Sequence, residues 1–342
     1  LAFDYLKYDE DGNVQETQRA VDGVDIDIKE GQFVAILGHN GSGKSTFAKH
    51  INALLLPTEG TIWIDGIDTS KEPELWKVRQ KAGMVFQNPD NQIIGTVVEE
   101  DVGFGPENMG IPAEEIEMRI TKALASTGMT AYREASPGAL SGGQKQKIAI
   151  SGVLAMEPEY LILDEPVAGM DAPGKKILFD LLHHLNKERG ITIVLVSHNM
   201  DDVAEHADRV LVMENGQIKM DGKTEEVFAR KDELTEMGVG VPQAVEFYLD
   251  LKEILEETDI DLDNAFSHDM QYNQKNREVS QKAIELSQEN VEINQKETKE
   301  KGTEMHKEKI EASNAKAKEH IKTKRTKNAG IPLSIDELAA YI

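Results

Sequence analysis

Short hydrophobic runs recur along the first two thirds of the chain, and longer amphipathic stretches separate them. Five runs stand out, at residues 33–37, 81–86, 160–163, 191–196 and 209–213. Short apolar runs bounded by turn residues are typical of strands that are buried on both faces. Strands that alternate with helices predict a mostly parallel sheet with right-handed crossovers. The pattern therefore indicates an α/β fold.

Two further stretches predict strands outside that set. Residues 21–28 alternate between apolar and polar positions, and residues 61–65 form a short β-type run closed by the turn pair Asp65-Gly66. Asn215-Gly216 predicts a hairpin turn that leads from 209–213 into an edge strand at 217–220. Between about 112 and 156 the pattern becomes helical.

The last third of the chain has a different composition. No proline occurs between Pro242 and Pro332, and Lys, Glu, Gln and Asn dominate the stretch. Its apolar residues do not follow the alternating three-and-four spacing of a coiled-coil seam. This stretch is either a long solvated helical excursion or a disordered insert, and it carries no recognisable chemistry.

Composition narrows the class of protein. The 342 residues suggest one large domain or two modest ones. No apolar stretch reaches the roughly 18 residues of a membrane-spanning helix, and no secretory leader is visible, although Leu1 need not be the native start. The absence of cysteine excludes disulfides and thiolate metal sites, as in a reducing cytosol. A net charge of −24 argues against a nucleic-acid partner. The charge could suit a basic partner, but the need for solubility is the simpler explanation.

A glycine-rich loop follows the first buried run and precedes a helix. Its GxxxxGKS motif consists of Gly38, His39, Asn40, Gly41, Ser42, Gly43, Lys44 and Ser45, and Thr46 follows it. In this strand–loop–helix context the backbone N–H groups and the helix dipole bind phosphates. We expect all nine residues to bind ATP, with Lys44 on the β- and γ-phosphates and the Ser45 hydroxyl on Mg²⁺.

Two carboxylates end the run at 160–163. In doubly wound sheets the carboxyl ends of the strands form the ligand-binding edge. Asp164 is therefore expected to hold Mg²⁺ through its water shell, and Glu165 to polarise the water that attacks the γ-phosphate. A carboxylate pair in another context would be a solvated turn or a helix cap, but here it accompanies a phosphate loop.

Single polar residues near the other strands complete the expected site. His198 follows the run at 191–196 and is a candidate for contacting the γ-phosphate and the attacking water. Gln87 ends another run and is a candidate sensor of Mg²⁺ and water. Asp171 is expected near a dimer seam. Tyr8 is a candidate adenine-stacking ring, with a core or surface role as its competitor.

A second glycine motif lies far from the first. It comprises Leu140 followed by Ser141, Gly142, Gly143 and Gln144, and a helix is expected to begin near Gln144. The bare N–H groups at such a helix start form another anion site. The segment is too distant to cover its own phosphate loop comfortably, so we expect a head-to-tail pair in which each subunit's loop covers the other's ATP.

The order of these motifs resembles ATP-binding-cassette (ABC) ATPases over residues 1 to about 230, with residues 140–144 as the signature loop. Residues 85–92 and 98–108 resemble more narrowly the ATPase of energy-coupling-factor transporters, the cobalt-type CbiO proteins. Residues 38–41 and 52–60 resemble the first of the two paralogues that pair in these transporters. Residues 241–243 and 330–338 resemble the two ends of the family's helical dimerisation hairpin, here separated by an insert.

The resemblance implies a P-loop core of ABC type with an N-terminal antiparallel β subdomain and an inserted helical subdomain at about 91–157. It implies a nucleotide-binding domain at 1–236 and a C-terminal helical extension at 237–342, interrupted by the polar insert at about 256–328. Departures from the family pattern occur at Val167, Met170, Lys145 and Lys147.

The same resemblance implies an ATPase peripheral to the cytoplasmic face of a bacterial membrane. It would pair with a second ATPase or with itself and grip a transmembrane coupling protein that holds a substrate-capturing component. Asn91 and Gln92 would lie near the grip. The family's cargo is a vitamin or a transition-metal ion.

Two alternatives belong to other classes. A soluble ABC ATPase acting on ribosomes or DNA usually carries two cassettes, or a coiled coil between the two glycine motifs, and this chain has neither. A regulatory module that binds ATP without turnover would not require Glu165 and His198, and both are present.

Overall fold

A six-stranded sheet forms the centre of the computed structural model, which describes residues 1–246 as one compact unit. The strand order is β10-β9-β3-β8-β7-β6, and all neighbours are parallel except β10 and β9. The strands are β3 (Phe33–Leu37), β6 (Ala82–Val85), β7 (Tyr160–Asp164), β8 (Thr192–Val196), β9 (Arg209–Glu214) and β10 (Gln217–Lys223). The expectations of a mostly parallel sheet and of an edge strand after Asn215-Gly216 are confirmed.

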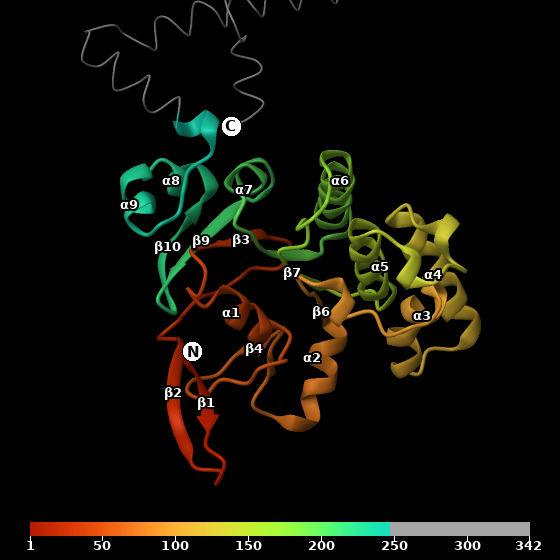
Figure 1. The fold of residues 1–342 in the computed structure, drawn as a ribbon, viewed down its shortest axis with the longest axis horizontal. Coiled ribbons are helices and arrows are strands. Elements are labelled where there is room, and N and C mark those ends of the chain that lie inside the picture. Colours follow the sequence, from red (N-terminus) through yellow and green to blue (C-terminus); the bar gives the residue numbers. More distant parts are fainter. Residues whose placement is uncertain (247–342) are drawn as a thin grey trace, which may run out of the picture. The chain divides into compact units, whose positions relative to one another are not determined.

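Helices cover both faces of this sheet (Figure 1). Along β3, Val34 and Ile36 join one buried cluster, which includes Phe47, while the alternate residues of the strand join a second cluster, which includes Leu182. Alternate side chains of a strand point to opposite faces, so both faces are apolar and buried. The helices beyond the inserted lobe are α1 (Lys44–Ile51), α2 (Leu75–Lys81), α6 (Ala172–Arg189), α7 (Met200–His206), α8 (Thr224–Phe228) and α9 (Lys231–Glu236).

Three helices form a separate lobe beside β6 (Figure 1). They are α3 (Val98–Asn108), α4 (Ala113–Ser126) and α5 (Gly142–Ala155), and they pack on one another. Arg133 links α3 to α4, because its guanidinium donates to Glu99 at 2.7 Å and to Glu117 at 2.5 Å. The lobe lies within the region that the resemblance assigned to a helical subdomain. Short 3₁₀ turns occur at η1 (Glu72–Glu74), η2 (Pro89–Asn91), η3 (Thr130–Tyr132) and η4 (Pro137–Ala139).

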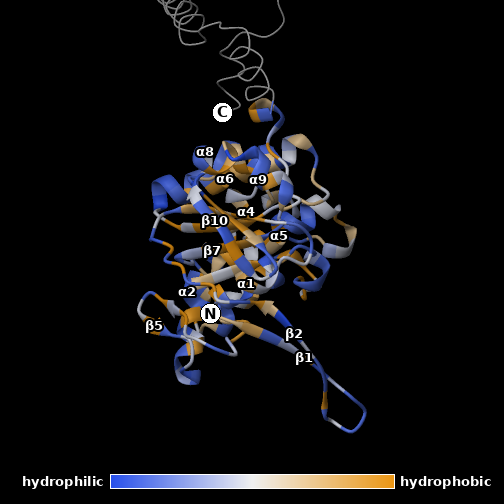
Figure 2. Ribbon diagram, turned by 90° about the vertical axis from the view of Figure 1, so that its left-hand side faces the viewer, coloured by the Kyte–Doolittle hydropathy of each residue, from blue (hydrophilic) through white to orange (hydrophobic). Residues whose placement is uncertain are grey.

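The N-terminal strands differ from those expected. β1 (Phe3–Tyr8) and β2 (Val14–Val21) form an antiparallel hairpin that extends from the rest of the unit, as Figure 2 shows. β4 (Trp63–Ile64) and β5 (Ile67–Asp68) form a second, much shorter hairpin. The prediction of a strand at 61–65 is therefore right only at its centre.

The predicted strand at 21–28 is wrong. β2 ends at Val21, Gly23 takes a left-handed φ of 66°, and no strand spans 22–28. The alternation nevertheless follows burial, because Val24, Ile26 and Ile28 are more buried than the acidic residues between them. Alternation thus indicated one buried side, but a strand also requires a hydrogen-bonded neighbour along its length.

Most predictions for the C-terminal region concern residues after 246, which the structure does not describe. The insert at 256–328 and the hairpin end at 330–338 lie outside the described residues. No helix within residues 1–246 combines the length and the apolar character that crossing a membrane requires.

Candidate nucleotide site

The glycine-rich loop between β3 and α1 has a backbone that only glycine accommodates. Gly38 and Gly43 have φ values of 148° and 103°. A Cβ at Gly38 would lie 2.3 Å from the Met213 carbonyl oxygen, and one at Gly43 would lie 2.4 Å from the Ala20 carbonyl oxygen. Gly43 caps α1 without a side-chain hydrogen bond, so the first N–H groups of the helix are left for an anion.

The side chains of Lys44 and Ser42 are buried in this loop, and neither has an anionic hydrogen-bond partner. The Lys44 ammonium donates to the carbonyl oxygens of Gly38 at 2.8 Å and His39 at 2.9 Å. Burial lowers the pKa of Lys44, and the charges of Glu165 and Asp164 oppose that shift. The Ser42 hydroxyl is buried and has no hydrogen-bond partner. A polyphosphate would supply the anion and the acceptor that these two groups lack, so the loop fits one.

Ser45 and Asp164 form an oxygen pair at the start of α1 and the end of β7. The Ser45 hydroxyl donates to Asp164 Oδ1 at 3.0 Å. Burial raises the pKa of the Asp164 carboxyl, while the Ser45 hydrogen bond lowers it. A hydroxyl and a carboxylate beside a phosphate loop suit Mg²⁺, which keeps waters and phosphate oxygens as its other ligands. No cluster of three or more His, Asp or Glu that could hold an ion by itself occurs in residues 1–246.

Two side chains that follow neighbouring strands contact Glu165. The Gln87 amide donates to Glu165 Oε2 at 2.7 Å, and His198 Nδ1 lies 3.2 Å from the same oxygen. Gln87 and His198 follow β6 and β8, which flank β7, so three neighbouring strands deliver them to one edge. Glu165 has a left-handed φ of 49°, and its N–H donates to the Val196 carbonyl at 2.9 Å. An unfavourable backbone held in this way is typical of functional sites.

The second glycine motif begins α5 in the helical lobe. The Ser141 hydroxyl accepts from the Gln144 N–H at 3.4 Å, and the Gln144 side chain accepts from the Ser141 N–H at 2.9 Å. With this capping box α5 begins at Gly142, which agrees with the helix expected to begin near Gln144. Ser141 and Gly142 are exposed.

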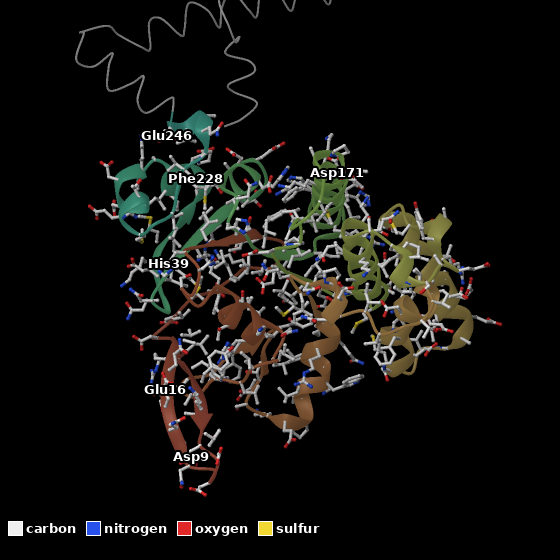
Figure 3. The ribbon with its side chains drawn as sticks, viewed as in Figure 1. Asp9, Glu16, His39, Asp171, Phe228 and Glu246 are labelled. Carbon is white, nitrogen blue, oxygen red and sulfur yellow. The ribbon has the colours of Figure 1, made fainter. Side chains whose placement is uncertain are left out.

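Two expected seam residues lie apart from the phosphate loop. α5 packs against α3 and α4, whereas α1 packs against β7 and β8. Asp171 caps α6 by accepting from the Gly174 N–H at 3.0 Å, and Figure 3 shows Asp171 well separated from His39 of the phosphate loop. Neither the second glycine motif nor Asp171 therefore joins the cluster around Glu165.

Tyr5, which the sequence interpretation missed, lies closer to α1 than Tyr8 does. The Tyr5 hydroxyl is 3.4 Å from Thr46 Oγ1, and its ring meets that of Phe3 edge to face at 4.9 Å. Tyr8 is 57% exposed near the hairpin's end. Strand alternation was the available signal, because Phe3 and Tyr5 share a face. The adenine-stacking role of Tyr8 stays a prediction.

Comparison with known proteins identifies the family of this chain. The sequence model of the ABC transporter family matches residues 21–168. An energy-coupling factor transporter ATP-binding protein of Clostridium novyi is 51% identical over 238 residues, which is 70% of this chain and 85% of the relative. This chain belongs to the ABC transporter family, in its energy-coupling-factor branch. Such ATP-binding subunits hydrolyse ATP to drive transport, so the chain is an ATPase.

Other relatives of this ABC cassette support the same family assignment. A cobalt import ATP-binding protein of Syntrophus aciditrophicus is 45% identical over 241 residues, covering 70% of this chain and 85% of that protein. Among solved structures, cbiO1 of Clostridium perfringens, described as part of an ABC transporter complex, is 38% identical with a TM-score of 0.58. That match covers 72% of this chain and 97% of cbiO1. The ABC-type fold expected from the motifs is thereby confirmed.

The cassette's departures from the family pattern leave the Glu165 turn in place. Val167 is buried in the core, and Met170 packs against it. The turn closes through the Ala168 N–H, which donates to the Glu165 carbonyl at 3.2 Å. Lys145, another departure, forms an ion pair with Asp90 at 2.6 Å.

Proposed function

We propose that this ATPase is the motor subunit of an energy-coupling-factor importer for a vitamin or a transition-metal ion. One observation carries the proposal: Gln87 and His198, from two different strands, contact the same oxygen of Glu165 beside the Ser45–Asp164 pair. A site that only bound ATP would not need two side chains against one carboxylate oxygen. The family membership supplies the link to transport.

Each residue has a proposed task in hydrolysis. The phosphate loop and Lys44 hold the β- and γ-phosphates, and Ser45 and Asp164 hold Mg²⁺, which withdraws charge from the phosphate oxygens. Gln87 and His198 orient Glu165 through Oε2. That arrangement leaves Oε1 to take a proton from the attacking water.

A second ATPase completes the proposed site. The signature loop, exposed at Ser141 and Gly142, belongs to the helical lobe, and α5 and α1 pack against different elements. A partner cassette would place its own Ser141–Gln144 loop over this chain's ATP, and ATP would then hold the pair closed. A related cassette, 33% identical with a TM-score of 0.59 over 66% of this chain and 96% of that one, is described as a dimer in a post-hydrolysis state with ADP and Pi.

Replacing Glu165 with Gln tests the hydrolytic role. We expect the turnover number to fall at least about 100-fold, because general-base catalysis is lost while the amide preserves the shape of the side chain. Glu159→Gln is the matched control, since Glu159 precedes the same strand and pairs with Lys81 outside the site. Turnover of Glu165→Gln near that of the control would remove Glu165 as the base.

Membrane partners test the transport role. We propose that the chain lies on the cytoplasmic face of the membrane, bound to a transmembrane coupling protein that holds a substrate-capturing component. The chain would be affinity-purified from native membranes in mild detergent, and co-eluting proteins identified by mass spectrometry. Recovery of these components and a second ATPase is expected. Recovery of ribosomal or DNA-repair proteins without a membrane partner would contradict the importer.

A further inference from the structure

An ion pair joins the signature helix to the segment that follows Gln87. Lys145 lies in the first turn of α5, and its ammonium is 2.6 Å from Asp90 Oδ1 in η2. The Lys145 side chain is only 20% exposed, while Asp90 is 64% exposed. The Asn88 side chain accepts from the Asp90 N–H at 2.9 Å, which fixes the turn that carries the carboxylate.

Amide side chains add further ties between the same two elements. The Gln146 amide donates to the Phe86 carbonyl at 3.2 Å. The Gln92 amide donates to the Ala149 carbonyl at 3.4 Å, and its oxygen accepts from the Phe86 N–H at 3.0 Å. Residues 86–92 are therefore bound to α5 along its first two turns, on both sides of Gln87 in the sequence.

Helix stability does not explain the ion pair. A cation in the first turn of a helix opposes the helix dipole. Partly exposed ion pairs contribute only about 0–1 kcal/mol to folding. The ion pair matters more for the position of the two elements that it joins. The segment that carries Asp90 contacts Glu165 through Gln87, and Lys145 lies in the first helical turn after Ser141.

We propose that Asp90 and Lys145 are positioning residues that make the signature loop and Gln87 move together. The inference rests on the proposed function, in which Glu165 is the base and Ser141 faces the partner's ATP. When the ion pair is intact, η2 follows α5 as a unit, and the Gln87 amide keeps its contact with Glu165. When it is broken, only the weaker amide contacts of Gln146 and Gln92 hold residues 86–92 to α5, so Gln87 follows α5 less closely and the base is less often aligned.

The test compares charge removal with charge exchange in the complex purified with the full chain. We expect Asp90→Asn and Lys145→Met each to lower the kcat of ATP hydrolysis on the order of tenfold, because misplacing a catalytic group by a fraction of an ångström reduces the rate steeply. The KM for ATP should change less than about twofold, since the phosphate loop is untouched. The exchanged pair D90K/K145D should recover most of the kcat.

Lys122→Gln is the matched control. Lys122 pairs with Glu157 at 2.8 Å at the far end of α5, so its loss removes a similar ion pair without touching residues 86–92. The control should keep wild-type kcat, and all variants should keep the wild-type thermal midpoint within a few degrees.

Four outcomes would overturn the inference. Single variants with wild-type kcat would show that the pair positions nothing. An exchanged pair no faster than the single variants would assign the loss to something other than the ion pair. Equal losses in Lys122→Gln would reduce the role to general stability of the lobe. A wild-type complex without turnover would contradict the proposed function itself, and the inference with it.

Discussion

At the scale of single residues, the site combines groups that folding alone would not favour. Glu165 has a left-handed backbone, Lys44 is a buried cation with a lowered pKa, and the Ser42 hydroxyl is buried without a partner. Each arrangement costs stability in the empty protein, on the order of 1–3 kcal/mol. A bound polyphosphate would account for Lys44 and Ser42, and the role proposed for Glu165 in hydrolysis would account for its backbone.

The choice between Tyr5 and Tyr8 is also made at this scale. We expect Tyr5→Ala to weaken ATP binding roughly tenfold, because its hydroxyl lies 3.4 Å from Thr46 Oγ1 near the start of α1 and base–aromatic stacking contributes about 1–3 kcal/mol. Titration of a fluorescent ATP analogue with Mg²⁺ measures the dissociation constant. Tyr8→Ala, in the same hairpin, should bind like the wild type. The reverse result would favour Tyr8 as the stacking ring.

At the scale of elements, two histidines join α6 to α7. His183 Nε2 and His206 Nδ1 lie 2.8 Å apart, so one imidazole donates to the other, and His206 stacks on Phe179 at 4.0 Å between ring centres. Burial lowers the pKa of His206 to about 4, with a further lowering from His183. The pair is stable only while at least one ring is neutral.

This contact predicts acid sensitivity. His206 has an unfolded-state pKa of about 6.5, so between that value and about 4 the unfolded chain binds the extra proton and stability falls as the pH falls. The loss should reach on the order of 3 kcal/mol near pH 4. Chemical denaturation at several pH values measures it. His206→Gln cannot gain the proton and should show a flatter pH dependence than the wild type.

His184→Gln serves as the comparison on the same helix. His184 is half exposed and pairs with Glu188 at the surface of α6. Its replacement should leave the acid sensitivity unchanged. If His206→Gln and His184→Gln titrate alike, the buried pair is not the source of the effect.

At the scale of the whole molecule, the described unit carries two glycine-rich helix starts in different parts of the fold. One is the phosphate loop before α1, and the other is the signature loop before α5. Because the two helices pack against different neighbours, the proposed function assigns the signature loop to the ATP of a partner cassette. We therefore expect ATP-dependent pairing.

Pairing can be captured with the variant that lacks the base. With ATP and Mg²⁺, Glu165→Gln is expected to form a stable pair of cassettes, with itself or with the second ATPase that co-elutes, because the nucleotide stays uncleaved. Sedimentation velocity distinguishes the pair from the single cassette. ADP should leave the cassettes separate. A pair that forms equally with ADP would show that the γ-phosphate is not what holds it.

Several features were determined by the sequence alone. The buried strands, the phosphate loop, the carboxylate pair and the signature loop all depend on local rules: apolar runs, glycines at left-handed positions, and a capping residue before a helix. Gly38 and Gly43 show why, since any Cβ there would collide with the backbone. Family membership was predictable for the same reason, because each motif is a run of consecutive residues that can be read directly from the chain.

Only the tertiary structure decided which distant groups meet. Nothing in the sequence placed Gln87 and His198 on the same oxygen of Glu165, because that contact depends on β6, β7 and β8 being neighbours. The same holds for the Lys145–Asp90 pair. Residues 21–28 show the converse error, since their alternation indicated burial, but their backbone hydrogen bonds, such as those between Val24 and Leu1, do not form a continuous ladder. Periodicity along a chain reports the environment of each side chain, whereas contacts between elements depend on how the chain returns on itself.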